Sequence, residues 1–194
     1  MSNTLNYYNE NVKSFIAGTV NVNFVKVQDI FLQLLPSRGT ILDFGCGSGR
    51  DTKYFLEHGY KVDAIDGSIE LCKFASQYTG INVIYKLFHE LTDVEKYDGI
   101  WACASILHVK KTELSEILQK MCNATKKNGI IYISFKYGDF EGERNGRYFT
   151  DMTEDSMSEL LTYIPELKVE NQWITGDVRE GRGEEKWLNM ILRK

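Results

Sequence analysis

The chain has 194 residues, of which 43% are hydrophobic and 26% are charged, with Pro 2. A chain of this length buries roughly 70% of its unfolded surface on folding, so we expect one folded domain over 1–194 and exclude a disordered protein or a Pro-rich linker. The formal net charge of -4 lacks the basic excess of proteins that grip many nucleic-acid phosphates. Nucleic acid is therefore disfavoured as a partner.

The four cysteines include no CxxC pair, so the sequence predicts neither a zinc site nor a dithiol motif, and no bound metal. The N-terminus is polar and amide-rich instead of basic and then apolar. No window reaches 18 uninterrupted apolar residues. We therefore expect a soluble, cytoplasmic protein that does not associate with a membrane.

Helical and strand-like hydrophobic periods alternate from residue 22 to residue 135. The predicted helices cover 22–35, 48–58, 68–78 and 111–125. The predicted strands cover 40–44, 61–65, 81–87, 100–103 and 130–135. This alternation indicates βαβ units and a parallel sheet with helices on both faces.

The chain changes character after residue 135. Residues 136–151, KYGDFEGERNGRYFTD, are charged, glycine-rich and without period, which predicts a long loop. A helix over 154–163 and two strand-like runs, 167–174 and 186–192, follow. Because no helix separates these two runs, we expect them to pair as an antiparallel hairpin. The predicted fold is α/β: a single Rossmann-like three-layer sandwich with a mostly parallel seven-stranded sheet and a C-terminal antiparallel hairpin.

Residues 41–50 read ILDFGCGSGR and place alternating glycines between a strand and a helix. Glycine permits positive φ and close approach of the backbone to a ligand at the carboxyl end of a strand. The dinucleotide pattern G-x-G-x-x-G fails, because the third residue after Gly47 is Arg50, and no G-K-[ST] of a Walker A motif follows. The glycine turn therefore favours a ligand other than a dinucleotide or a nucleoside triphosphate.

Two acidic residues accompany the glycine turn. Asp43 comes just before the glycines, where a carboxylate repels a pyrophosphate and favours a cationic ligand. Asp66 ends the second strand, where a carboxylate can accept hydrogen bonds from both ribose hydroxyls. A ligand with a ribose, a positive centre and no phosphate is S-adenosylmethionine.

Over roughly 39–135 the sequence resembles the class I S-adenosylmethionine-dependent methyltransferases. ILDFGCGSGR resembles their first motif, residues 62–66 their second, and KYDGIWACASILHV their fourth-strand segment. GCGSGRDTKYFLEHGYKVDAIDGS is most similar to the small tellurite-resistance type and related small-molecule methyltransferases. The resemblance implies a cofactor-binding core over 39–135, N-terminal helices over the cofactor site in 1–38, and a substrate loop, helix and hairpin in 136–194.

The resemblance also implies which residues bind S-adenosylmethionine. Asp43 is expected near the cofactor ammonium, directly or through water, and Asp66 at the ribose. The contacts expected around the methionine part are Asp43, Gly45, Cys46, Gly47, Arg50, Ala102 and Cys103. The contacts expected around the ribose and adenine, with the N-terminal segment folded over them, are Tyr8, Asp66, Gly67, Ser68, Phe88 and His89.

Several of these residues have a structural alternative that the sequence leaves open. Cys46 also suits a small space-filling residue, Arg50 a helix-surface arginine and Phe88 an ordinary core residue. The family often has an acid where this chain has residues 87–88. We therefore expect the backbone or Glu90 to contact the adenine amino group.

Methyl transfer from a sulfonium is a direct displacement that needs alignment, exclusion of water and sometimes a base. His108, just beyond the fourth strand, is the candidate catalytic base, and hydrogen bonding to the following helix is its alternative role. Arg144 and Arg147 have the chemistry to grip a carboxylate or phosphate. The expected substrate contacts are Tyr7, His108, Lys136, Arg144, Arg147 and Tyr148.

Three segments around this site have two interpretations each. The segment with Tyr7 and Tyr8 is either a cover over the cofactor or an amphipathic helix resting on the sheet. Residues 136–151 form either a lid or a solvated loop. Residues 177–185, with Trp187 nearby, are a weaker substrate candidate and otherwise a surface hairpin.

The leading hypothesis is a methyltransferase, monomeric or homodimeric, that acts on a small molecule: a thiol, amine, carboxylate or metalloid oxyanion. The alternatives are a module that binds the cofactor without turnover and a methyltransferase acting on a macromolecule. Residues 102–105 lack the [NDS]-P-P-[YFW] element common in methylation of nucleic-acid base amino groups, which disfavours that chemistry. The broken glycine fingerprint disfavours a nicotinamide oxidoreductase.

Overall fold

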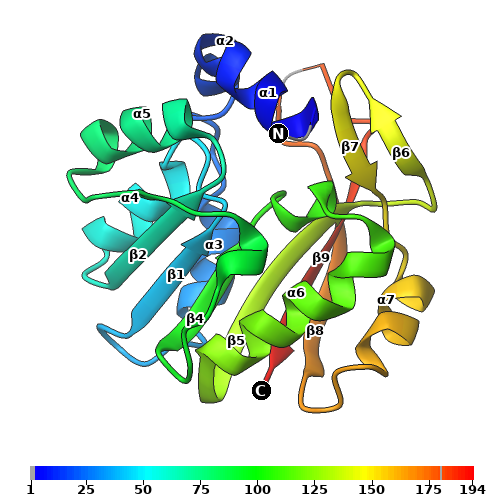
Figure 1. The fold of residues 1–194 in the computed structure, drawn as a ribbon. Helices are drawn as coiled ribbons and strands as arrows, with labels where there is room; N and C mark the ends of the chain where they lie inside the picture. Colours follow the sequence, from blue (N-terminus) through cyan, green and yellow to red (C-terminus); the bar gives the residue numbers. More distant parts are fainter. Residues whose placement is uncertain (1–2, 180) are drawn as a thin grey trace.

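The computed structural model describes residues 3–179 and 181–194, and a seven-stranded sheet runs through its centre (Figure 1). The strand order is β3-β2-β1-β4-β5-β9-β8. All neighbouring strands from β3 to β5 pair in parallel, whereas β9 is antiparallel to both β5 and β8. The strands are β1 (Thr40–Phe44), β2 (Lys61–Asp66), β3 (Ile84–Tyr85), β4 (Tyr97–Ala102), β5 (Thr125–Lys136), β8 (Lys168–Gly176) and β9 (Lys186–Arg193). The predicted fold class is confirmed.

Helices cover both faces of this sheet, because its central strands are apolar on both sides. Leu42 faces one cluster of buried side chains and its neighbour Ile41 faces another. The first cluster lies under α6 and α7, and the second lies under α3 and the buried side of α4. The helices are α3 (Val25–Leu32), α4 (Arg50–Glu57), α5 (Ile69–Thr79), α6 (Lys111–Ala124) and α7 (Glu154–Leu161).

Local sequence signals fix where two of these helices begin and end. The Ser68 hydroxyl accepts a hydrogen bond from the backbone N–H of Leu71 at the start of α5, and Gly80, with φ of 79°, ends that helix. Thr153 caps α7 in the same way by accepting from the N–H of Ser156. These helix boundaries lie within two residues of the predicted ones.

Two short helices, α1 (Asn3–Glu10) and α2 (Val12–Ala17), lie beyond the carboxyl ends of the strands, at the top of Figure 1. The Thr4 hydroxyl accepts a hydrogen bond from the N–H of Tyr148 at 2.9 Å. The Ser68 hydroxyl donates to the side-chain oxygen of Asn9 at 2.7 Å. Residues from opposite sides of the molecule thus hold the N-terminal segment in place.

The expectation of a long irregular loop over 136–151 is wrong. The segment forms a two-stranded antiparallel sheet of β6 (Glu141–Arg144) and β7 (Arg147–Thr150). Asn145 and Gly146 join the strands with φ of 52° and 75°, the pair of positive values that a two-residue type I′ hairpin requires. Most of the side chains on this hairpin are charged or polar, so the usual alternation of apolar and polar residues is hidden.

Other element boundaries also differ from the prediction. The strand expected over 81–87 is reduced to β3 and is followed by a short 3-10 helix, Phe88–Glu90. The helix predicted over 111–125 is confirmed as α6, whereas the strand predicted over 130–135 begins directly after that helix, at Thr125. A second 3-10 helix, Ile106–His108, follows β4. None of the described helices is long and apolar enough to cross a membrane.

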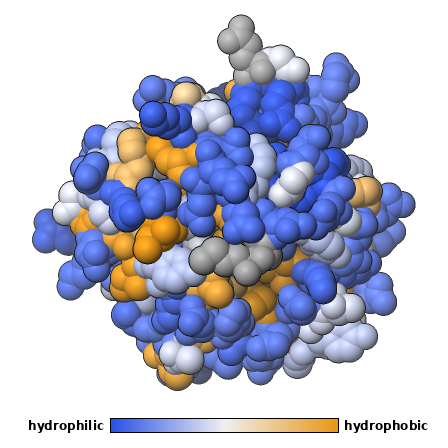
Figure 2. Space-filling view, turned by 45° about the horizontal axis from the view of Figure 1, so that its top comes forward, coloured by the Kyte–Doolittle hydropathy of each residue, from blue (hydrophilic) through white to orange (hydrophobic). Residues whose placement is uncertain are grey.

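The surface is mixed in character. Figure 2 shows a mostly hydrophilic face interrupted by small hydrophobic patches. The exposed large apolar side chains are spread over several elements and include Val94, Tyr163 and Val178. Isolated apolar side chains of this kind are normal for a folded domain and do not by themselves mark a docking site.

Candidate active site

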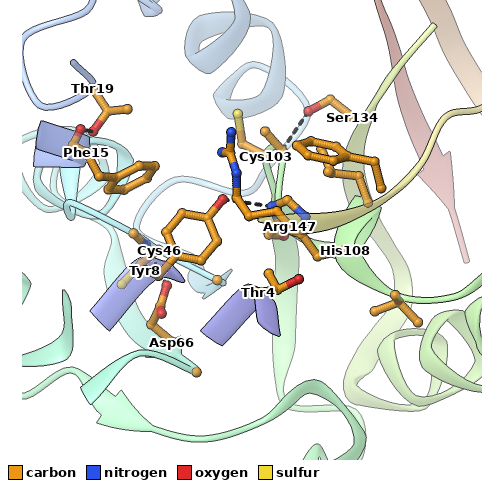
Figure 3. A pocket seen from close by; sticks show the side chains of 18 of the residues that line it. Thr4, Tyr8, Phe15, Thr19, Cys46, Asp66, Cys103, His108, Ser134 and Arg147 are labelled. Atoms are coloured by element: carbon orange, nitrogen blue, oxygen red, sulfur yellow. Dashed lines mark hydrogen bonds between the residues drawn. The ribbon is translucent and has the colours of Figure 1, made fainter. Parts of the chain in front are cut away.

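A cavity of about 1040 Å³ lies at the carboxyl ends of the parallel strands. Its walls are α1 and α2, the glycine turn, the segments after β2, β3 and β4, the end of β5, and parts of the β6–β7 and β8–β9 hairpins. The order of the strands reverses between β1 and β4, and such a switch point is where open α/β sheets bind ligands. Figure 3 shows the side chains that converge on this space.

The Asp66 carboxylate, at the end of β2, is held by two backbone groups. The N–H of Gly47 donates to one oxygen at 2.9 Å and the N–H of Ser68 donates to the other at 2.8 Å. Burial raises the pKa of Asp66, although these hydrogen bonds act to lower it. Because the anchoring donors are main-chain groups of the glycine turn and of the α5 cap, the fold itself aims this acid into the cavity.

The glycine turn brings the backbone close to the opposite wall. Gly45 has φ of 88°, and a Cβ there would lie 2.5 Å from the Cβ of Ser105. A Cβ on Gly47, with φ of 56°, would lie 3.1 Å from the ring of Phe15. In the part of the chain that the structure describes, the buried Ser105 hydroxyl has no hydrogen-bond partner. The glycines thus allow close packing of the turn against Ser105 and Phe15, and the unpaired hydroxyl and the fixed acid suit a polar, ribose-containing ligand.

Asp43, expected beside the ligand, lies behind the turn and outside the cavity lining. Its exposed fraction is 2%, and it accepts a 2.5 Å hydrogen bond from the Thr52 hydroxyl. Burial and the nearby negative charge of Asp51 raise the pKa of Asp43. Asp43 is therefore not positioned for direct contact with a ligand in the cavity.

Asp51, which the sequence analysis missed, is the acid that reaches the cavity from α4. It accepts hydrogen bonds from Gln28 at 2.7 Å, from the Trp101 indole at 2.8 Å and from Arg50 at 2.7 and 2.8 Å. The only sequence signal for it was an acid in the first turn of a helix, which is common. Arg50 lines the cavity with its charge paired to Asp51, and its guanidinium also lies 4.8 Å from the Phe24 ring.

Tyr8 and His108 meet across the cavity. The Tyr8 hydroxyl lies 2.7 Å from His108 Nε2, and Nδ1 of the same ring lies 2.6 Å from the carbonyl oxygen of Tyr148. A carbonyl only accepts, so Nδ1 bears the proton and Nε2 accepts from Tyr8. Burial and, to a smaller extent, the positive charge of Arg147 lower the pKa of His108 to about 4, although the hydrogen bond to the carbonyl acts to raise it. Burial raises the pKa of Tyr8.

The two hairpin arginines have different surroundings. Arg144 does not line the cavity and donates twice to the Asp151 carboxylate, at 2.6 and 2.8 Å. Arg147 lines the cavity, with its guanidinium 4.5 Å from the centre of the Tyr7 ring and 5.1 Å from that of Phe149. The structure thus separates two residues that the sequence analysis had treated as a pair.

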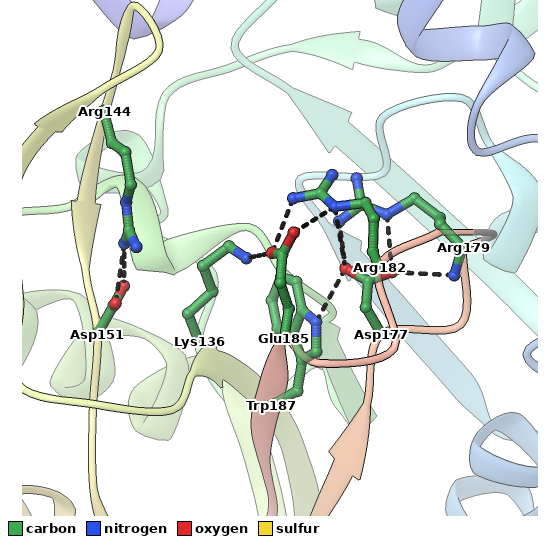
Figure 4. A network of polar contacts seen from close by, with 8 residues as sticks. All are labelled: Lys136, Arg144, Asp151, Asp177, Arg179, Arg182, Glu185 and Trp187. Atoms are coloured by element: carbon green, nitrogen blue, oxygen red, sulfur yellow. Dashed lines mark hydrogen bonds and ion pairs between the residues drawn. The ribbon is translucent and has the colours of Figure 1, made fainter.

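The tip of the β8–β9 hairpin joins the cavity wall through an ion-pair network (Figure 4). We call this the mouth network: Lys136, Asp177, Arg179, Arg182, Glu185 and Trp187. Lys136 and Arg182 both pair with Glu185, and Arg179 donates to Asp177 at 2.8 and 2.5 Å. Burial would raise the pKa of Asp177, but hydrogen bonds from Arg179 hold it at about 2. Hydrogen bonds from Arg182 lower the pKa of Glu185 to about 2.

The remaining expected residues divide between the cavity and the scaffold. Those that line the cavity are Cys46, Gly67, Phe88, His89, Cys103 and Tyr148. Ser68 caps α5, Ala102 is fully buried in β4, and Tyr7 lies against Arg147. Phe88 lines the cavity, and its ring centre lies 4.6 Å from that of Phe44. Its position is therefore compatible both with contact to the adenine and with an ordinary core residue. Further lining residues that were not singled out from the sequence are Thr4, Ser105, Ser134 and Asn189.

These features define a class of protein: a Rossmann-type α/β domain with a nucleoside-sized site at its switch point. Residues 8–173 match the family model described as a methyltransferase domain. The chain belongs to this methyltransferase family, and its identification as a class I S-adenosylmethionine-dependent methyltransferase is confirmed. The more specific likeness to the tellurite-resistance type stays a prediction.

Known proteins of similar sequence or structure fit this assignment. A protein of Staphylococcus carnosus described as an uncharacterized methyltransferase is 28% identical over 166 residues, covering 78% of this chain and 80% of that protein. The 1,6-didemethyltoxoflavin-N1-methyltransferase of Burkholderia thailandensis, solved with 1,6-didemethyltoxoflavin and S-adenosylhomocysteine, has a TM-score of 0.77 at 22% identity, covering 98% and 84% of the two chains. The N-methyltransferase NodS of Bradyrhizobium japonicum, solved with S-adenosylhomocysteine, has a TM-score of 0.73 at 16% identity, covering 96% and 97%. At these identities the two structures show a shared fold.

Proposed function

We propose that this protein transfers a methyl group from S-adenosylmethionine to a small-molecule acceptor. The observation that carries the proposal is the Asp66 carboxylate, fixed by the backbone N–H groups of Gly47 and Ser68 at the edge of the cavity. This carboxylate keeps lone pairs for the two hydroxyls of a ribose. The small-molecule ligand in the Burkholderia thailandensis enzyme of the same fold supports an acceptor of that size.

The residues of the cavity suit binding and orientation of the cofactor. Asp66 would accept from the ribose hydroxyls, and the amino-acid part would lie along the glycine turn, where Gly45 and Gly47 line the cavity. Asp51, whose two oxygens already accept hydrogen bonds from Gln28, Arg50 and Trp101, would place its negative charge near the ammonium end without a free acceptor site, a role expected earlier for Asp43. When bound, the cofactor supplies an electrophilic methyl group on a sulfonium. Direct displacement from it depends mainly on alignment and on exclusion of water.

The Tyr8–His108 pair would position the acceptor and move its proton. The Tyr8 oxygen is placed to accept a proton from the acceptor while the hydroxyl proton passes to Nε2 of His108. A histidine with a pKa of about 4 holds that proton only weakly at neutral pH. We therefore assign the pair to an acceptor that needs little base assistance, such as a free amine or an ionised thiol or oxyanion.

Calorimetric titration with S-adenosylmethionine and with S-adenosylhomocysteine tests the proposal. We expect micromolar binding of both, and no binding of either would refute it. A screen of thiols, amines, carboxylates and metalloid oxyanions for methylated product then separates an enzyme from a module that binds without turnover. The cytoplasmic location and the monomeric or homodimeric state stay predictions from the sequence.

A further inference from the structure

Arg147 differs from the other arginines that line the cavity. Arg50 pairs with Asp51, and Arg179 and Arg182 pair with carboxylates of the mouth network. Within residues 3–179 and 181–194, no carboxylate lies within ion-pair distance of Arg147, and its buried Nε has no hydrogen-bond partner. The hairpin therefore presents to the cavity a positive charge that is not neutralised by an acid.

Aromatic residues surround this charge, and the side chain of Arg147 also hydrogen-bonds to Tyr8, which leaves the buried Nε without a partner among the residues that the structure describes. The guanidinium carbon lies 4.5, 5.8 and 5.1 Å from the ring centres of Tyr7, Tyr8 and Phe149. Rings of this kind stabilise a cation through their faces. The in-plane N–H groups of a guanidinium form a planar fork whose geometry matches a carboxylate, and leaving a buried donor unpaired costs free energy.

The position of Arg147 connects this charge to the reacting end of the cavity. Its positive charge acts to lower the pKa of both Tyr8 and His108, which are joined by a hydrogen bond. In the view of Figure 3 it lies on the other side of the Tyr8 ring from Asp66. Leu107, Val109 and Phe149 contribute apolar side chains to the same cavity. The Phe149 ring lies edge-on to the His108 ring, with 4.9 Å between the ring centres. An anion held by Arg147 would therefore have an apolar wall beside it.

We propose that the methyl acceptor is an anion, a carboxylate on a small, partly apolar body, and that Arg147 binds its negative group. This proposal rests on the proposed function and assigns its substrate class. Arg144 does not take part, because Asp151 already occupies its guanidinium. Tyr8 and His108 lie beside the bound anion and orient the carboxylate oxygen that would form a bond to the methyl carbon while the bond from that carbon to the sulfonium sulfur breaks. The products would be a methyl ester and S-adenosylhomocysteine, and no proton would need to be removed. Arg147 thus acts as a residue that determines specificity.

The test uses benzoate and benzamide, which differ in charge at nearly the same shape, and inorganic phosphate, which has charge without an apolar body. Each probe is titrated by calorimetry and by thermal shift into the full chain, with and without saturating S-adenosylhomocysteine. We expect benzoate to bind at least tenfold more tightly than benzamide and than phosphate. Equal binding of benzoate and benzamide, or binding of neither, would overturn the proposal.

Variants of Arg147 test whether this residue is responsible for the binding of benzoate. We expect Arg147→Gln to weaken benzoate at least tenfold and Arg147→Lys to recover part of the loss, with the affinity for S-adenosylhomocysteine unchanged in both. Arg144→Gln, on the same hairpin, is the matched control and should bind benzoate as the original chain does. A loss of S-adenosylhomocysteine affinity in Arg147→Gln without a loss of benzoate binding would overturn the proposal and assign Arg147 to the cofactor carboxylate.

The same experiment separates the two proposals. If the original chain fails to bind S-adenosylhomocysteine, the proposed function fails, while the benzoate titrations without it still decide whether Arg147 forms an anion site. Circular dichroism of each variant shows that the comparison is made between folded proteins.

Discussion

The Tyr8 hydroxyl donates a 2.7 Å hydrogen bond to Nε2 of His108, which lies 100 residues further along the chain. The contact joins the N-terminal helix α1 to the segment after β4, and it crosses the space where a ligand would lie. The carbonyl oxygen of Tyr148 fixes the other nitrogen of the ring. Three separate parts of the sequence therefore set the protonation state of one side chain.

The buried His108 should make the protein lose stability on acidification. Its pKa of about 4 in the folded state is below the usual value of 6.5. The stabilisation is complete above pH 6.5 and is lost as pH falls from 6.5 to 4, because over this range the unfolded chain binds a proton that the folded chain does not. The contribution at neutral pH is up to about 3 kcal/mol.

Urea unfolding between pH 4.5 and 7.5 measures this contribution. We expect His108→Gln to have a shallower decline of unfolding free energy toward low pH than the original chain. His58→Gln, which changes an exposed histidine on the far end of α4, is the control and should keep the original slope. Parallel curves for all three proteins would contradict the burial argument.

Replacing Asp66 should weaken cofactor binding. Asp66→Ala removes the charged acceptor for the ribose hydroxyls, which corresponds to roughly 1.5–3 kcal/mol of binding free energy. The measurement is calorimetric titration with S-adenosylhomocysteine. Asp63→Asn is a matched control on the same strand, because Asp63 pairs with Lys96 and Tyr97 and does not line the cavity. Equal affinities for Asp66→Ala and the original chain would remove Asp66 from the site.

A methyl group on Gly45 should disturb the site more than the same change elsewhere. Gly45→Ala places a Cβ 2.5 Å from that of Ser105 in addition to straining a φ of 88°, so we expect at least tenfold weaker S-adenosylhomocysteine binding and about 2–4 kcal/mol lower unfolding free energy. Gly59→Ala has a similar φ of 83° with nothing within 4 Å, so it isolates the backbone strain. If the two variants unfold with the same free energy and bind alike, the close approach to Ser105 has no role.

Loosening the mouth network should free the tip of the β8–β9 hairpin. Glu185 accepts from Arg182 and Lys136 and thereby ties the hairpin tip to β5. We expect Glu185→Gln to speed amide hydrogen exchange in residues 175–187, as measured by mass spectrometry. Glu170→Gln breaks the ion pair with Arg193 at the other end of the same hairpin and should leave that segment unchanged. Identical exchange in both variants would show that the network does not hold the tip.

The sequence predicted well those features that depend on neighbours along the chain. The cap at Ser68, the glycine turn and the alternation of strands and helices are local patterns, and the structure confirms them. The 141–150 hairpin was not predicted, because the charged and polar residues around its Asn145–Gly146 turn show no alternation of apolar and polar residues. Regular structure on a polar hairpin does not show in the hydrophobic period.

The site residues were harder to predict, because burial and pairing are decided by distant parts of the chain. Asp43 and Asp51 are both acids next to the glycine turn, and only the packing of β1 and α4 shows that Asp51 faces the cavity. Arg144 and Arg147 have the same chemistry and differ in one partner, Asp151. No spacing rule in the sequence could have distinguished either pair.

The buried indole of Trp101 stacks on Tyr132 at 4.0 Å and donates its N–H to Asp51, which lines the cavity. An indole whose N–H is bound to a carboxylate changes its emission when that carboxylate changes partners. The hydrogen bond links the indole in the sheet to a side chain of the cavity wall. We therefore expect ligand binding to change the fluorescence of Trp101, so that binding could be followed without an attached dye.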